Sequence, residues 1–253
     1  MTRVSVAGIT GWTGRAVAAA IDAADDLQLV SGVSRSAAGE ERVYGTVAEA
    51  LAAAPADVLV DYTSAEAVKG NVHGALEARV AVVVGSSGLT DADYEEIDAH
   101  AREAGVGVIA AGNFSLLAAL LLRCAAEVAR HVGSWEIVDY ASAQKPDVPS
   151  GTARELAERL GEVRRPLVGR PLESLHGPVE ARGASVGGAQ IHSVRLPSFV
   201  VSTEIVFGAP GERLVLRHDP NDSPEPYVAG TLYAVRAVRG RLGLTRGLDV
   251  LLP

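Results

Sequence analysis

Apolar and polar residues alternate in blocks along the first 110 residues, and this pattern predicts strands separated by helices. Short runs such as Val80–Val84 are apolar at consecutive positions, which is typical of parallel strands that are buried on both faces. The expected strands are Arg3–Ala7, Leu27–Val33, Asp57–Asp61, Val80–Val84 and Val106–Ala110. The expected helices are Gly14–Ala24, Ser64–Ala78 and a helix that Thr90 caps and that runs to about Ala104.

The pattern changes after Asn113. A long apolar helix is followed by a segment of alternating polarity, a polar loop, a short helix that Gly161 is expected to stop, and a hairpin in an antiparallel sheet. These elements are expected at Leu116–Val132, Trp135–Ala141, Thr152–Leu160, Thr203–Phe207 with Arg213–Arg217, and a final helix at Tyr227–Val238. Strands separated by helices predict a doubly wound sheet in the first half, so we expect an α/β protein of two domains.

Composition narrows the class of protein. A hydrophobic fraction of 48% supports a buried core, and 31 acidic against 23 basic residues give a net charge of −8, which argues against nucleic-acid and anionic-membrane binding. No apolar run approaches the ~18 residues of a membrane span, and the first residues lack the layout of a signal peptide. The single cysteine, Cys124, excludes an internal disulfide and a multi-thiolate metal site and is expected to be buried. We therefore expect a cytoplasmic protein without a metal.

A glycine-rich turn follows the first strand. Gly8, Gly11 and Gly14 lie between that strand and the first helix, where glycine lets the backbone approach a diphosphate at the helix start. The intervening Thr10, Trp12 and Thr13 are candidate cofactor-binding residues as well. Three glycines alone also occur for packing reasons, but their place at the first strand–helix junction favours a dinucleotide.

The end of the second strand indicates which dinucleotide is preferred. Sites that prefer NAD place an acidic residue here, whereas this chain has Ser34, Arg35 and Ser36. Hydroxyls and a guanidinium suit a 2′-phosphate, so we predict NADPH, with NADH bound more weakly. The alternative is that Arg35 is a solvated loop residue.

A lysine-containing loop in the second half resembles an anion site. It runs from Lys145 to Ala153, and Thr152 with Glu155 is predicted to form a capping box at a helix start. Unpaired N–H groups near Gly151 and Thr152, beside a lysine, would bind a carboxylate, and Ser150 is a further candidate substrate-binding residue. The alternative is a well-capped helix with a solvated lysine.

This loop is similar to the K-x-D-x-P-S-G-T-A motif of the 4-hydroxy-tetrahydrodipicolinate reductase (dihydrodipicolinate reductase) family. Further matches follow in the family's order along nearly the whole chain. They are Val6-Ala7-Gly8, Asp61-Tyr62-Thr63, Gly85-Ser86-Ser87-Gly88, Gly112-Asn113-Phe114-Ser115, Ile191-His192-Ser193-Val194-Arg195-Leu196-Pro197, Phe207-Gly208 to Gly211-Glu212, and Arg217-His218-Asp219.

The resemblance implies a fold, an assembly and further site residues. It implies a Rossmann dinucleotide-binding domain of residues 1–113 plus 220–253, and a smaller mixed α/β domain of residues 114–219 for substrate binding and oligomerisation, usually as a homotetramer. Lys145 and the helix start at Gly151–Thr152 would hold a substrate carboxylate. The loops that would flank the nicotinamide contribute Gly85, Ser86, Ser87, Ala110, Asn113 and Phe114.

One departure from the family is large. The family pattern H-H-x-x-K has two histidines, of which the first is taken to protonate the ring carbon and the second to help bind carboxylate. In that register this chain has Ala141 and Ser142, which do not titrate near neutral pH. His192 belongs to the family's own motif and does not replace them.

Three hypotheses follow. The preferred one is an NADPH-dependent reductase of a carboxylated cyclic imine or related C=N/C=C substrate, because hydride addition to a protonated imine needs no acid to protonate a carbon. The alternative is an authentic 4-hydroxy-tetrahydrodipicolinate reductase of lysine and diaminopimelate biosynthesis, with Lys145, Tyr140 or a water replacing the acid. The third is a non-catalytic NADP(H)-binding protein.

Overall fold

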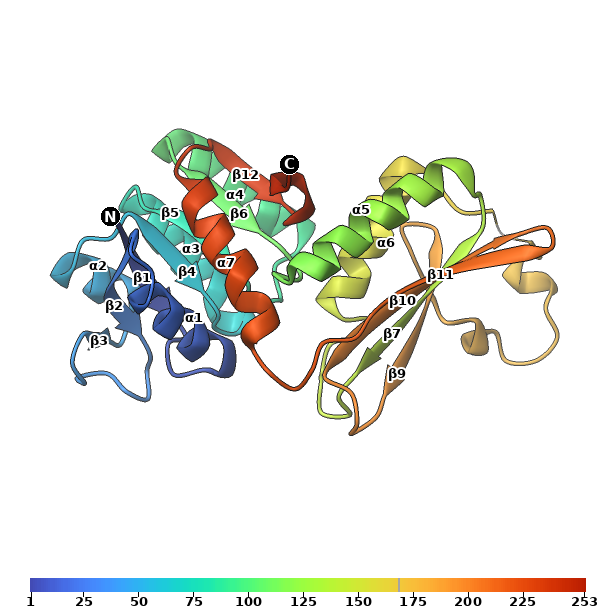
Figure 1. Cartoon of the computed structure of the whole chain (residues 1–253), viewed down its shortest axis with the longest axis horizontal. Helices are drawn as coiled ribbons and strands as arrows, with labels where there is room; N and C mark the ends of the chain where they lie inside the picture. Colours follow the sequence, from blue (N-terminus) through green and yellow to red (C-terminus); the bar gives the residue numbers. More distant parts are fainter. Residues whose placement is uncertain (168) are drawn as a thin grey trace. The chain divides into compact units, whose positions relative to one another are not determined.

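The computed structural model describes residues 1–167 and 169–253 and divides into two compact units (Figure 1). Unit 1 comprises Met1–Leu116 and Pro224–Pro253, and unit 2 comprises Leu117–Ser223. Both junctions lie within a few residues of the boundaries that the sequence suggested. The roles expected for the two domains are taken up below as proposals.

Unit 1 contains a parallel seven-stranded sheet in the order β12-β6-β5-β4-β1-β2-β3. The strands are β1 (Thr2–Ala7), β2 (Leu27–Val33), β3 (Val43–Tyr44), β4 (Val58–Asp61), β5 (Ala81–Val84), β6 (Gly107–Ala110) and β12 (Gly243–Arg246). The helices are α1 (Trp12–Asp22), α2 (Val47–Ala53), α3 (Ala65–Glu77), α4 (Asp91–Ala104) and α7 (Glu225–Val238), with a short 3-10 helix at Asp249–Leu251.

Helices cover both faces of this sheet (Figure 1). Apolar residues of α2, α3 and α4 form one core with the strands, and α1 packs beside α7 against the sheet. Strands β4, β5 and β6 are buried at every position, which is why their sequences are apolar without alternation. The predicted α/β class and doubly wound sheet are confirmed.

Unit 2 contains a five-stranded sheet in the order β11-β10-β7-β9-β8. Its strands are β7 (Trp135–Ala141), β8 (Ala184–Val186), β9 (Ala189–Arg195), β10 (Val201–Ala209) and β11 (Glu212–His218). Its helices are α5 (Leu116–His131) and α6 (Gly151–Val163), with 3-10 helices at Leu172–Ser174 and Val179–Arg182. The hairpin of β10 and β11 is present, but β7 pairs parallel with β9, so the sheet is mixed and the antiparallel expectation was incomplete.

Three local predictions were wrong. α6 continues past Gly161 to Val163. Gly161 does not end the helix but allows the backbone of Gly187 to approach it, since a Cβ there would lie 2.7 Å from the Gly187 carbonyl oxygen. The cap of α6 is Ser150, whose Oγ accepts from Ala153 N, so Thr152 lies inside the first turn and makes no capping box. Cys124 lies on the exposed side of α5.

No helix in the described part of the chain is long and apolar enough to cross a membrane.

Candidate functional site

The turn after β1 requires its glycines. Gly8 has a φ of +80°, and a Cβ there would lie 2.1 Å from the Tyr62 carbonyl oxygen. A Cβ at Gly14 would lie 2.1 Å from the carbonyl oxygen of Gly8, and Gly11 N donates to that same oxygen at 2.8 Å. The backbone therefore packs too closely at this junction to admit side chains.

The start of α1 fits a phosphate group. Its N-cap is Gly11, which offers no side-chain acceptor, and no acidic residue lies in the first turn. The N–H groups there have no side-chain cap and carry the positive end of the helix dipole. Trp12 is half exposed beside them, in edge contact with Tyr227 at 6.0 Å, and Thr13 is partly exposed. The residues present therefore fit the diphosphate of a dinucleotide.

A chain of hydroxyls joins this turn to the end of β2. Thr10 Oγ1 lies 3.0 Å from Ser34 Oγ, which lies 3.1 Å from Ser36 Oγ. Arg35 between the two serines is exposed, and Arg15 Nη2 donates to the Thr10 carbonyl at 3.2 Å. Sequence reasoning missed Arg15, although an arginine one position after the last glycine is a visible sign. The group of hydroxyls with two arginines fits a 2′-phosphate.

The loops after β4 and β5 are joined by one buried carboxylate. Asp61, at the end of β4, accepts from Ser86 Oγ at 2.6 Å and from Thr63 Oγ1 at 2.7 Å. Gly85 next to Ser86 is required, because a Cβ there would lie 2.2 Å from the Tyr62 ring. The motif containing Asp61 was recognised from the sequence, but the link between the two loops was not.

The remaining predicted nicotinamide residues lie at the end of β6, apart from Ser87 in the loop after β5. Asn113 is partly exposed, and its Oδ1 accepts from Ser115 N at 2.8 Å, which fixes the loop. Ala110 and Phe114 are buried, and Phe114 packs against the Tyr62 ring at 6.2 Å. Ser87 is exposed in the β5 loop. The structure thus brings the predicted cofactor residues to the carboxyl ends of neighbouring parallel strands, where ligands bind in such sheets.

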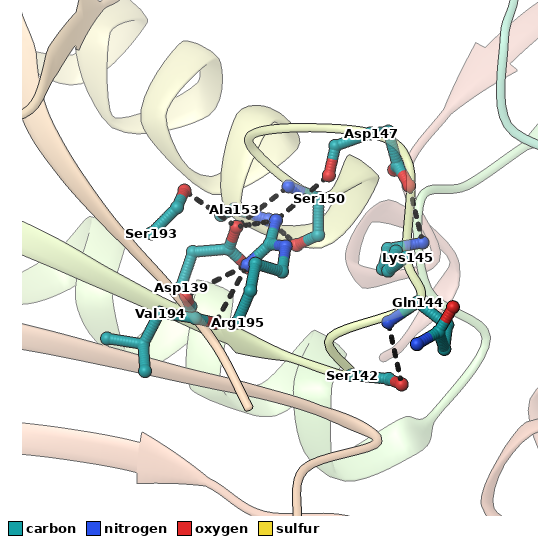
Figure 2. Close-up of polar contacts among 10 residues, drawn as sticks. All are labelled: Asp139, Ser142, Gln144, Lys145, Asp147, Ser150, Ala153, Ser193, Val194 and Arg195. Atoms are coloured by element: carbon teal, nitrogen blue, oxygen red, sulfur yellow. Dashed lines mark hydrogen bonds and ion pairs between the residues drawn. The ribbon is translucent and has the colours of Figure 1, made fainter. Parts of the chain in front are cut away.

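In unit 2, the lysine loop lies between β7 and α6 (Figure 2). Lys145 Nζ pairs with Asp147 Oδ1 at 2.9 Å, and both side chains are about three-quarters buried, with relative exposures of 25% and 29%. Ser150 is the N-cap of α6, and Gly151 and Thr152 begin its first turn. An ammonium and a helix start on one short loop can together bind an anion, with Asp147 as the competing partner of the lysine.

A buried ion pair holds this loop (Figure 2). Asp139 is fully buried, and its Oδ2 accepts from Arg195 Nη2 at 2.8 Å, from Ser150 N at 2.9 Å and from Ser193 Oγ at 3.1 Å. Arg195 Nη2 also donates to the Asp147 carbonyl at 2.9 Å. Burial alone would raise the pKa of the Asp139 carboxyl, but the Ser150 hydrogen bonds and Arg195 outweigh it, so its pKa lies below the ordinary value.

Sequence reasoning missed this pair, although a sign of it was present. Residues of β7 alternate between buried and half-buried, and Asp139 falls on the buried side with Trp135, Ile137 and Ala141. A charged residue on an apolar face needs a buried partner.

Position 141 carries no acid. Ala141 is buried at the end of β7, and Ser142 Oγ accepts from Gln144 N at 3.3 Å. Tyr140 points to the opposite face of the sheet, where its ring packs on Phe199 and under Arg217, so it does not replace an acid on the face of Ala141.

His192 does not replace the acid either. It lies in register with Val138, on the same sheet face as Tyr140, and its Nε2 pairs with Glu136 at 2.7 Å.

Comparison with known protein families shows to which family the chain belongs. A family model described as the N-terminus of dihydrodipicolinate reductase matches residues 2–114, and one described as its C-terminus matches residues 116–251. The chain belongs to the dihydrodipicolinate reductase family. This reductase is therefore an NAD(P)H-dependent oxidoreductase, as the sequence analysis expected.

Full-length relatives agree. The chain is 38% identical to the 4-hydroxy-tetrahydrodipicolinate reductase of Nocardia farcinica over 98% of its length and 97% of the relative. It is 37% identical to the 4-hydroxy-tetrahydrodipicolinate reductase of Cutibacterium acnes, over 100% of this chain and 99% of the relative. A dipicolinate-bound dihydrodipicolinate reductase from Paenisporosarcina sp. TG-14 has a TM-score of 0.80 at 29% identity, covering 100% of both chains. GenD2 from gentamicin A biosynthesis, at 18% identity and a TM-score of 0.66, shares the fold only.

Proposed function

We propose that this protein reduces 4-hydroxy-tetrahydrodipicolinate with NADPH. The observation that carries the proposal is the match to relatives of that name over nearly the whole length of both chains. The comparisons thus favour the interpretation that the sequence analysis held as its alternative. They give no support to altered chemistry.

The residues of each unit support this reaction in a distinct way. The bound dinucleotide supplies hydride. The glycine turn and the start of α1 would bind its diphosphate, and the hydroxyl chain of Thr10, Ser34 and Ser36 with Arg35 its 2′-phosphate. In unit 2, Lys145 and the N–H groups at Gly151 and Thr152 would bind a substrate carboxylate. The dipicolinate bound to the solved relative is a dicarboxylate, which is the class of ligand such a site suits.

A second candidate rests on Ala141 and Ser142. A reductase that adds hydride to a conjugated C=C must also protonate a carbon, and neither residue provides a proton. A cyclic imine that carries a carboxylate needs hydride at carbon only, once its nitrogen is protonated. The same cofactor and carboxylate sites would serve such a substrate.

The assembly and location are proposed from the family resemblance. We propose a cytoplasmic homotetramer built through the sheet of unit 2. Its edge strand β11 exposes the apolar residues Leu214 and Val215, one on each face of the sheet, and neighbouring subunits would cover them.

One assay separates the two candidate substrates. NADPH oxidation is measured with 4-hydroxy-tetrahydrodipicolinate, prepared in situ, and with a panel of carboxylated cyclic imines. A kcat/KM above about 10⁴ M⁻¹ s⁻¹ on the former supports the first proposal. A value at least about a hundredfold higher on an imine supports the second, since loss of a general acid costs about that much. No oxidation with any substrate would refute both.

A further inference from the structure

Asp61 is a buried carboxylate whose two oxygens accept four hydrogen bonds. Its Oδ1 accepts from Thr63 N at 3.1 Å, Thr63 Oγ1 at 2.7 Å and Ser86 Oγ at 2.6 Å, and its Oδ2 accepts from Asn71 Nδ2 at 2.8 Å. The side chain has no exposed surface. Asp61 therefore joins Thr63, Asn71 and Ser86.

An ionised carboxylate is a hydrogen-bond acceptor only, which suits the four donors around Asp61. Ser86 Oγ accepts from Thr63 N at 2.7 Å and lies 3.4 Å from the Asp61 carbonyl oxygen, and Thr63 Oγ1 accepts from Asn71 Nδ2 at 3.3 Å. The N–H groups of Thr63 and Asn71 can only donate to this carboxylate. Within the described ranges, no lysine, arginine or histidine pairs with this carboxylate. A charge without a counterion in a protein interior is costly unless something compensates it.

We infer that Asp61 is a positioning residue that stabilises the oxidised, cationic form of the nicotinamide. This inference rests on the proposed function and on the family resemblance, which implies that the loop containing Ser86 flanks the nicotinamide. The oxidised ring carries one more positive charge than the reduced ring. A fixed negative charge behind that loop favours the oxidised form and so favours hydride departure. Its hydrogen bonds to Thr63 and Ser86 also join the loops after β4 and β5, the second of which would hold the ring.

The test compares the affinities of the two cofactor forms. Dissociation constants for NADP⁺ and NADPH are measured by calorimetry on the whole protein, without substrate. Asp61→Asn keeps the shape of the side chain and removes the charge. We expect it to raise the ratio Kd(NADP⁺)/Kd(NADPH) roughly tenfold, which is the effect of one charge about 12 Å away at an effective dielectric constant of about 20. For a two-electron couple this equals a shift of about 30 mV in the potential of the bound cofactor.

A second pair of variants leaves Asp61 in place. Asn71→Lys puts an ammonium beside the Asp61 carboxylate and neutralises its charge. Asn71→Met is the control, because methionine is similar in length to lysine and has no charge. We expect Asn71→Lys to raise the same ratio and Asn71→Met to leave it within twofold of wild type. If Asp61→Asn does not fold, the comparison of Asn71→Lys with Asn71→Met tests the inference.

The outcomes separate this inference from the proposed function. A purely structural role predicts that all variants weaken both cofactor forms equally, and an unchanged ratio in Asp61→Asn and Asn71→Lys would overturn the inference while the proposed function stands. A wild-type protein that binds neither form would overturn both.

Discussion

Replacing Arg195 by methionine should destabilise unit 2 strongly. The guanidinium is the ion-pair partner of the fully buried Asp139, and its side chain is only 16% exposed. Methionine fills much of the same volume without charge. The substitution therefore leaves Asp139 buried without its counterion, with only the hydrogen bonds from Ser150 and Ser193, and it also frees the Asp147 carbonyl.

The expected loss is about 3–5 kcal/mol of unfolding free energy, the usual effect of removing one partner from a buried pair. A matched control is Arg130→Met in the same unit. Arg130 pairs with Glu127 one helical turn away, with both side chains more than 60% exposed. Such surface pairs contribute about 0–1 kcal/mol, so this control should remain close to wild type.

The assay is urea unfolding, followed by the fluorescence of Trp135 in unit 2 and by circular dichroism. Asp139→Asn combined with Arg195→Met should recover part of the loss, because an amide oxygen still accepts from Ser150 N and no buried charge is left alone. A loss of unfolding free energy below about 1 kcal/mol in Arg195→Met would refute the reasoning. So would a double variant that loses more unfolding free energy than the two single variants lose together.

Acid provides a second test of the same pair. The pKa of Asp139 is lowered in the folded protein, so its contribution to stability is present above the ordinary aspartate pKa near about 4 and is lost as the pH falls through the lower folded value. Wild type should therefore lose stability on acidification, and Arg195→Met should lose less over the same pH range. Equal acid sensitivity of the two proteins would contradict this view of the pair.

Three further predictions concern the proposed reaction. Arg35→Ala should weaken NADPH binding about 10- to 150-fold and leave NADH nearly unchanged in calorimetric titrations; equal losses would remove the 2′-phosphate assignment. Lys145→Ala should raise KM for the carboxylated substrate at least about tenfold without changing the Kd of NADPH, and an unchanged kcat/KM would refute the carboxylate site. Ala141→His with Ser142→His should raise kcat/KM on 4-hydroxy-tetrahydrodipicolinate and not on a simple cyclic imine, since only the former needs protonation at carbon. Equal gains on both substrates would contradict that reason.

Five of the seven strands of unit 1 were predicted, because burial on both faces demands continuous apolar residues, as in Val80–Val84. The short β3 and the partly buried β12 were missed. Pairing between strands was not predictable in unit 2. Strand β7 has the same alternation whether its neighbour is parallel or antiparallel, so its parallel pairing with β9 left no mark in the sequence. The prediction that Gly161 ends α6 was wrong for a related reason. Glycine can end a helix, but it also occurs where another backbone segment packs closely, which here is that of Gly187.

The candidate site was predictable where backbone constraints select a residue type. Gly8 and Gly14 are required by close contacts, so their spacing identified the turn. The carboxylates at Asp61 and Asp139 were missed as organising residues, because their partners are distant in the chain. Helix capping was misassigned by two positions, since Ser150 and Thr152 are both good caps and only the backbone conformation distinguishes them.

Isotope transfer tests the central claim most directly. The protein is incubated with 4-hydroxy-tetrahydrodipicolinate and NADPH deuterated on either face of the nicotinamide carbon that donates hydride, and the product is analysed by mass spectrometry and NMR. The proposed function predicts tetrahydrodipicolinate that carries deuterium on a ring carbon from one of the two labelled cofactors. Product without deuterium from either cofactor, or no product while a cyclic imine becomes labelled, would contradict it.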